Sequence, residues 1–168
     1  LVFGTSNGLT IFNPQSIVEN QTIPEVIITD FQIFNKSVLD YSKKSLLERP
    51  INHTAEMTLT HNHSVFSFGF SALNYIMPER NQYAYKLEGF DSEWVQAGSR
   101  RTTTYMNLDA GDYVFRVKGS NNEGVWNEVG AAVAIHVLPP WWKTWWAYGL
   151  YVFGILLLIA RDVYSCLL

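Results

Sequence analysis

A turn and a strand follow each other in the stretch Leu108-Asp109-Ala110-Gly111-Asp112-Tyr113-Val114-Phe115-Arg116-Val117-Lys118. Tyr113, Phe115 and Val117 recur at every second position, and a strand points alternate side chains to opposite faces. The stretch therefore predicts a strand with one buried face. A turn just before Tyr113 is also what a tyrosine corner needs, in which the phenol hydroxyl bonds to upstream backbone. A tyrosine that only fills the core is the alternative.

The same alternation recurs along the chain. Further apolar sets are Phe66, Phe68 and Phe70; Tyr83, Tyr85 and Leu87; and Ala131, Val133, Ile135 and Val137. Residues 26–34, 57–59 and 102–106 are weaker strand candidates. Six or seven short strands separated by turn signals predict an all-β fold, an immunoglobulin/fibronectin-III-like antiparallel β-sandwich over residues 25–138.

Composition excludes several classes of protein. The 168 residues carry a net charge of −3 and no basic stripe, which argues against a nucleic-acid partner. Aromatic residues make up 15% of the chain and can fill a core, which excludes a disordered chain. The single cysteine, Cys166, leaves the sandwich without a disulfide. No methionine or signal peptide opens the chain, so we expect a piece of a longer protein.

The N-terminal residues 1–14 predict a β-hairpin. Two short apolar runs flank Ser6-Asn7-Gly8, and an Asn-Gly turn suits a tight hairpin. Because a lone hairpin is marginal in water, we expect it to close a structure that lies upstream. Residues 15–24 are predicted to be a linker.

The C-terminal stretch from Trp141 to Ala160 begins with four tryptophans and continues as an apolar run. Tryptophans collect at the level of lipid headgroups, and 20 residues of helix match a hydrocarbon core of about 30 Å. We therefore predict a Pro/Trp juxtamembrane segment at 139–146, a single C-terminal transmembrane α-helix at 145–162 and the start of a cytoplasmic segment at 163–168. A buried core helix is the alternative. The expected membrane anchors are Trp141, Trp142, Trp145 and Trp146.

Several of these motifs together resemble the three-tyrosine (YYY) domain of bacterial hybrid two-component system histidine kinases. The residues that carry the resemblance are Tyr83, Tyr85, Leu87, Gly89, Trp94, Tyr105, Leu108, Gly111, Tyr113 and Trp126. Residues 1–14 are similar to the last repeat of the β-propellers that precede this domain. The resemblance covers roughly residues 60–138, and its implications are expectations here.

The resemblance implies a periplasmic signal-relay domain in a sensor of the inner membrane, with residues 1–140 in the periplasm. Upstream propeller domains would bind an oligosaccharide, and the sandwich would couple them to a membrane helix and a cytoplasmic histidine kinase. The partners would then be the propellers, the lipid bilayer and a second copy in a homodimer. Pro139 and Pro140 restrict φ and are predicted to form the coupling hinge.

No arrangement of residues predicts catalysis or a cofactor. The carboxylates fall in turns, and no pair is brought together as a glycosidase requires. His61 and His63 share one strand face, but no clear third ligand accompanies them, so no metal site is predicted. A second hypothesis remains, a membrane-anchored module that binds glycans or proteins without signalling output. In that case Trp94 and Trp126, which lie next to loops, would contact a sugar.

Overall fold

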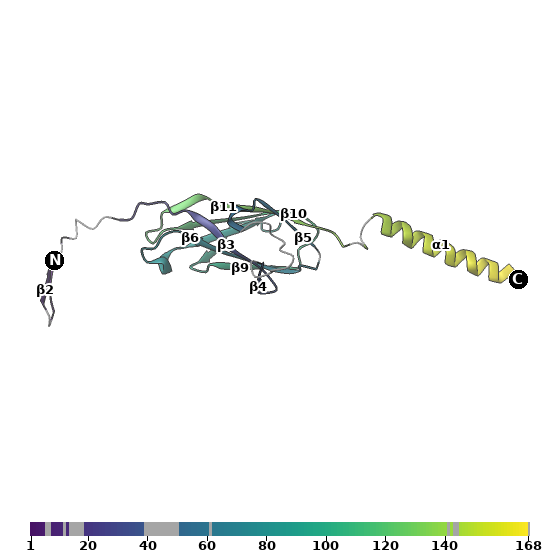
Figure 1. The fold of residues 1–168 in the computed structure, drawn as a ribbon, viewed down its shortest axis with the longest axis horizontal. Helices are drawn as coiled ribbons and strands as arrows, with labels where there is room; N and C mark the ends of the chain where they lie inside the picture. Colours follow the sequence, from purple (N-terminus) through teal and green to yellow (C-terminus); the bar gives the residue numbers. More distant parts are fainter. Residues whose placement is uncertain are drawn as a thin grey trace.

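The computed structural model describes residues 1–5, 8–11, 13, 19–38, 51–60, 62–140, 142 and 145–167. Figure 1 shows a central β-sandwich with a hairpin near the N-terminus and a helix at the C-terminal end. The sandwich agrees with the β-sandwich part of the predicted fold, whereas the transmembrane part is corrected below. Trp141, His61 and Leu168, which entered the predictions, lie outside the described residues.

The larger sheet has five strands in the order β5-β11-β10-β7-β8. They are β5 (Glu56–Leu59), β7 (Tyr83–Glu88), β8 (Val95–Gly98), β10 (Gly111–Ser120) and β11 (Trp126–Val137). β10 pairs antiparallel with both β7 and β11, whereas β5 pairs parallel with β11. The predicted sandwich was antiparallel throughout, so this parallel edge is a difference.

The smaller sheet has four strands in the order β4-β3-β6-β9. They are β3 (Val26–Ile33), β4 (Lys36–Ser37), β6 (Val65–Ala72) and β9 (Thr102–Met106). Two short 3-10 turns, η3 (Ile51–His53) and η4 (Pro78–Arg80), lie between strands. The strands β4 and β8 are only two and four residues long, too short for a clear period-two pattern, and were not predicted from the sequence.

Aromatic rings from both sheets meet in the core. Phe68 of β6 and Phe115 of β10 are fully buried, and their rings stack at 4.2 Å with an interplanar angle of 10°. Phe31 and Phe66 pack on the same ring system. Each buried ring of this size contributes about 1.5–3 kcal/mol relative to an exposed one. The period-two sets therefore point inward, as predicted.

Strand β11 joins two ends of the sandwich. Its first residue, Trp126, pairs with Ser120 near the point where residues 19–24 arrive, which we call the entry end. Its last residue, Val137, pairs with Leu59, and the chain leaves from there through Leu138 and Pro140, which we call the exit end. A 12-residue strand spans about 40 Å, so β11 runs the length of the domain.

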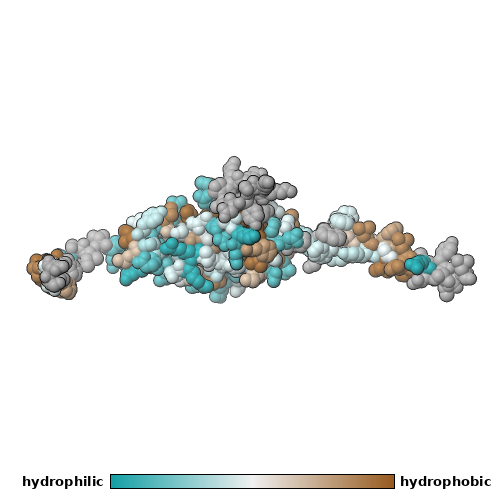
Figure 2. Space-filling model, turned by 60° about the horizontal axis from the view of Figure 1, so that its bottom comes forward, coloured by the Kyte–Doolittle hydropathy of each residue, from teal (hydrophilic) through white to brown (hydrophobic). Residues whose placement is uncertain are grey.

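The hairpin near the N-terminus consists of β1 (Val2–Thr5) and β2 (Gly8–Ile11), which pair antiparallel. Figure 2 shows apolar residues gathered on this hairpin and on the C-terminal helix, while the face of the sandwich in this view is mostly hydrophilic. Assignment of the hairpin to a propeller repeat stays a prediction.

The predicted transmembrane helix is wrong. Helix α1 (Trp145–Leu167) forms, but among the described residues no helix is long and apolar enough to cross a membrane. The prediction counted Trp and Tyr rings toward the 20 residues from Trp141 to Ala160, although these rings carry polar edges. The run without them, from Val152 to Ala160, would cover only about 14 Å at 1.5 Å per residue.

Candidate functional site

Two tyrosine hydroxyls tie the two sheets together. Tyr83 of β7 is fully buried, and its hydroxyl accepts a hydrogen bond of 3.1 Å from the backbone N–H of Ala72 in β6. Tyr105 of β9 donates to the carboxylate of Asp91 at 2.8 Å, and Asp91 follows β7 in the opposite sheet. Burial and the Asp91 carboxylate both raise the pKa of Tyr105, so this phenol stays protonated and donating.

The third hydroxyl closes the predicted tyrosine corner. Tyr113 donates to the carbonyl of Asp109 at 3.0 Å, which confirms the turn-and-strand prediction. Gly89 has φ of 93°, and an added Cβ would lie 3.0 Å from the Tyr113 ring, so glycine lets the ring approach. Gly111 lies beside the same ring, and Leu108 packs against the core. Leu87 is fully buried, and Tyr85 is partly buried against the core.

Asparagines hold the incoming chain at the entry end. The asparagine cluster comprises Asn20, Asn74, Asn81, Asn121, Asn122 and Asn127. Asn121, 1% exposed, donates to the carbonyls of Asn20 at 2.6 Å and Thr22 at 2.9 Å. Its own side-chain oxygen accepts from the N–H groups of Glu123 and Val125. Each amide serves as donor and acceptor at once, which satisfies buried polar groups.

The amides of the cluster also bond to one another. Asn74 donates to Asn81 at 2.8 Å and to Asn122 at 3.0 Å, and Asn81 is fully buried. Asn20 donates to Asn74 at 3.3 Å and to Asn122 at 3.2 Å. Asn20 begins the sequon Asn20-Gln21-Thr22, and its side-chain nitrogen, the atom to which a glycan would be attached, is thus engaged in these bonds.

Asn127 connects the incoming chain to strand β11. Its side-chain nitrogen donates to the carbonyl of Pro24 at 2.8 Å, and its oxygen accepts from Val129 and Gly130. These bonds shape an irregularity in the β10–β11 register. Gly130 has φ of 60°, and a Cβ there would lie 2.0 Å from the Val117 carbonyl oxygen. The bulge therefore depends on glycine at this position.

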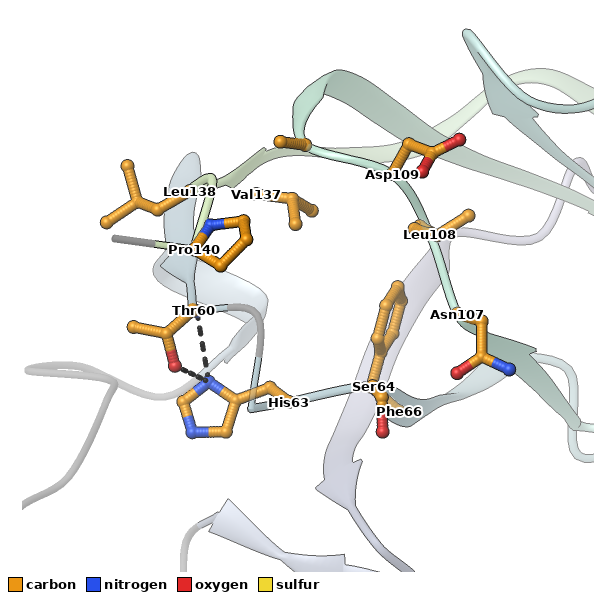
Figure 3. A pocket seen from close by; sticks show the side chains of 11 residues that line it. Thr60, His63, Ser64, Phe66, Asn107, Leu108, Asp109, Val137, Leu138 and Pro140 are labelled. Atoms are coloured by element: carbon orange, nitrogen blue, oxygen red, sulfur yellow. Dashed lines mark hydrogen bonds between the residues drawn. The ribbon is translucent and has the colours of Figure 1, made fainter. Parts of the chain in front are cut away.

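A cavity of about 230 Å³ lies at the exit end. Figure 3 shows Thr60, His63 and Pro140 on one side and Asn107, Leu108 and Asp109 on the other. The side chain of His63 accepts from the N–H of Thr60 at 3.2 Å. Leu138 donates its backbone N–H to the carbonyl of Leu59 at 2.8 Å, immediately before the two prolines. Pro140 lines the cavity while Pro139 is exposed.

An imidazole near the exit lies between two carboxylates. His136 of β11 contacts Asp112 of β10 at 2.7 Å and lies 3.9 Å from Glu56 of β5. The hydrogen bond to Asp112 raises the pKa of His136 above its usual value. Among the described residues no group of three or more ligating side chains could hold a metal ion.

Trp94 and Trp126, which would contact a sugar under the second hypothesis, lie on either side of a lysine. Trp94 is 37% exposed and Trp126 partly buried, and the Lys118 ammonium lies 4.8 Å and 5.6 Å from their ring centroids. Lys118 also pairs with Glu128 at 2.8 Å. The structure thus brings Trp94 and Trp126 together on one face of the five-stranded sheet.

The C-terminal tryptophans lie apart from the sandwich core. Trp142, Trp145 and Trp146 are all exposed, and Trp145 is 86% exposed. Their anchoring role stays a prediction. The asparagine cluster was not predicted from the sequence. The one available signal is the run Asn121-Asn122-Glu123-Gly124, which reads as a turn and carries no hint of its distant partners.

Comparison with known proteins gives consistent matches. Residues 74–138 match the Y_Y_Y domain. Histidine kinase P4 of Formosa agariphila is 39% identical over 149 residues, which are 89% of this chain and 11% of that protein. The chain thus spans about a tenth of this curated relative.

Solved structures give the same picture. The extracellular domain of BT4673 from B. thetaiotaomicron has a TM-score of 0.65 and 26% identity over 80% of this chain and 18% of that one. The extracellular domain of BT3049 from the same organism, described as a hybrid two component system, has a TM-score of 0.61 and 28% identity. It covers 82% of this chain and 20% of that one. The matched family is a sensor domain and not a catalytic domain. Residues 74–138 therefore belong to the Y_Y_Y domain family, within a chain that resembles the extracellular domains of two-component sensors.

Proposed function

We propose that residues 19–140 form a periplasmic relay module of a two-component sensor. The module carries a displacement from ligand-binding domains upstream of residue 19 to the segment that leaves at Pro140. Upstream propellers would bind the ligand, an oligosaccharide, and a histidine kinase downstream would read the displacement. The kinase name of the curated relative and the extracellular solved domains support this assignment.

One observation carries the proposal. Asn127 bonds to Pro24 of the incoming chain and lies in β11, whose far end is the exit. From Asn127 to Val137 the strand covers about 33 Å without leaving the sheet. A movement of residues 20–24 would therefore pull directly on the strand that ends at Val137, next to Leu138.

Rigidity between the two ends makes such a pull effective. The bonds from Tyr83 and Tyr105 join the sheets, and the stacked rings of Phe68 and Phe115 fill the space between them. Close-packed interiors transmit strain instead of absorbing it. A bias of only about 1–3 kcal/mol between two arrangements would suffice for signalling.

The decisive variant removes the hydrogen bond from Asn127 to Pro24 and keeps the bonds that shape the bulge. In Asn127→Asp the carboxylate still accepts from Val129 and Gly130 but no longer donates to Pro24. We expect ligand-dependent output of the full-length sensor to fall, measured with a transcriptional reporter, and Asn62→Ala at an exposed site to leave it unchanged. Unchanged output in Asn127→Asp would contradict the relay.

The exit can be tested in the same assay. Replacing Pro139 and Pro140 with glycines frees φ at both positions and should weaken the response. Full ligand-dependent signalling with this double variant would refute stiff coupling at the exit.

A binding module without signalling output is the second candidate. The position of Trp94 and Trp126 on one sheet face favours it. Calorimetric titration of the chain with oligosaccharides distinguishes the two candidates. Saturable heat that disappears in Trp94→Ala would favour the binding module, and absence of heat would favour the relay.

A further inference from the structure

Exposed apolar residues, which we call the apolar rim, lie at the entry end of the sandwich. Its members are the exposed residues Ile23, Leu73, Tyr75, Ile76 and Met77, with Tyr75 83% and Ile76 59% exposed. The loop 73–77 follows β6, and Leu73 donates its N–H to Glu25 at 2.7 Å, so the loop lies against the incoming chain. Contiguous exposed apolar residues of this kind mark interaction surfaces.

The rim is held rigidly. Asn74, the second residue of the loop, is 9% exposed and donates to Asn81, Asn122 and the carbonyl of Ile76. Met77 adopts a left-handed conformation with φ of 54°, which is unfavourable for a non-glycine residue. A loop that is fixed and strained while its apolar side chains face solvent is preorganised for a partner.

The hairpin also carries an exposed apolar face. The register of β1 and β2 places Val2, Leu9 and Ile11 on one face, and these side chains are 60–69% exposed. A two-stranded hairpin is marginal alone, so this apolar face needs cover. Nine Cα–Cα steps separate Ile11 from Asn20, which limits the reach of the hairpin from the asparagine cluster to about 30 Å.

We propose that the rim docks the all-β domain that hairpin β1–β2 completes. This inference rests on the proposed function only in naming that upstream domain as the source of the signal. Because the linker confines the two surfaces, their effective concentration is about millimolar, and a modest apolar contact is enough to hold them together. Docking would let the upstream domain push on loop 73–77, and through Asn74 and Asn20 on the asparagine cluster.

The test is photo-crosslinking in the full-length sensor. A photoreactive phenylalanine analogue is placed at Tyr75, and at Met106 as a control, which is 60% exposed and ends β9. We expect the probe at position 75 to capture peptides of residues 1–11 or of the upstream domain about tenfold more than the probe at position 106. The reason is that the short linker holds the upstream domain close to the rim. Capture of position 75 by a second copy, or no capture, would overturn the proposal.

A second measurement separates this proposal from the relay. Signalling is measured in Asn127→Asp alongside the crosslinking. Loss of output in Asn127→Asp without capture at position 75 overturns docking and leaves the relay standing. Capture at position 75 with normal output in Asn127→Asp supports docking and contradicts the relay. Tyr75→Ser, at an exposed side chain, should leave the fold intact and weaken capture from a probe at Ile76.

Discussion

At the entry end the chain is held by side chains, whereas at the exit end it is held by backbone. Asn121 and Asn127 bond to three carbonyls of residues 20–24. At the exit, Leu138 makes one backbone bond to Leu59, and Pro139 and Pro140 have no N–H to donate. Single side-chain substitutions can therefore release residues 20–24 at the entry end, whereas the exit end depends on strand pairing and on the fixed φ angles of the prolines.

The largest effect should come from the bulge that joins the entry to β11. In Gly130→Ala the new Cβ would lie 2.0 Å from the Val117 oxygen, so the backbone must shift. We expect the free energy of unfolding to fall by about 3–5 kcal/mol, measured by urea denaturation. Gly124→Ala is the matched control, with φ of 82° and open space around it, and should cost about 1 kcal/mol. Equal losses of unfolding free energy in the two variants would show that the backbone near Gly130 can shift with little loss of stability.

The next effect tests the side-chain hold at the entry. Asn121→Ala removes both donors to residues 20 and 22 and leaves the N–H groups of Glu123 and Val125 without their acceptor. We expect a loss of about 2–4 kcal/mol in unfolding free energy and faster proteolysis before residue 24. Wild-type cleavage kinetics in this variant would mean that the asparagine cluster does not hold the incoming chain.

Two tyrosines allow the two ends to be compared. Tyr83 bonds to Ala72 at the entry end, where Ala72 pairs with Val26, and Tyr113 pairs with Ile135 near the exit end. Tyr83→Phe leaves the buried N–H of Ala72 without the hydroxyl acceptor, and we expect it to cost about 2 kcal/mol. Tyr113→Phe frees only the carbonyl of the exposed Asp109, and should cost about 1 kcal/mol. Thermal denaturation of both variants checks the order. A larger loss for Tyr113→Phe would reverse the view that the entry end depends more on side-chain bonds.

Sequence predicted what repeats locally. The alternation of Phe66, Phe68 and Phe70 located β6, and the turn before Tyr113 located the corner, because both patterns lie within a few neighbouring residues. The parallel pairing of β5 with β11 joins residues 56–59 to 134–137, and no local pattern encodes such a distant partner.

The asparagine cluster escaped prediction for the same reason. Asn20 and Asn121 are 101 residues apart, and an asparagine in a turn reads as a solvated residue unless its partner is known. The transmembrane prediction failed differently, since it counted ring size as hydrophobicity and gave Trp and Tyr the weight of aliphatic residues. Period-two alternation in the sequence thus indicates which side chains are buried. Polar networks between distant segments can be identified only once the three-dimensional structure is known.

The smallest effect concerns charge at the exit end. His136 faces Asp112 on β10 and Glu56 on β5, and the bond to Asp112 raises its pKa above the unfolded value. A raised folded pKa stabilises the protein fully below the unfolded pKa of about 6.5, and this stabilisation is lost as pH rises through the folded pKa. The melting temperature of the wild type should therefore exceed that of His136→Gln by more at about pH 5.5 than at about pH 9. The side chains are exposed, so salt should shrink the difference. An equal difference at both pH values would mean that the imidazole contributes nothing through its charge, and that backbone pairing and the prolines alone hold the exit.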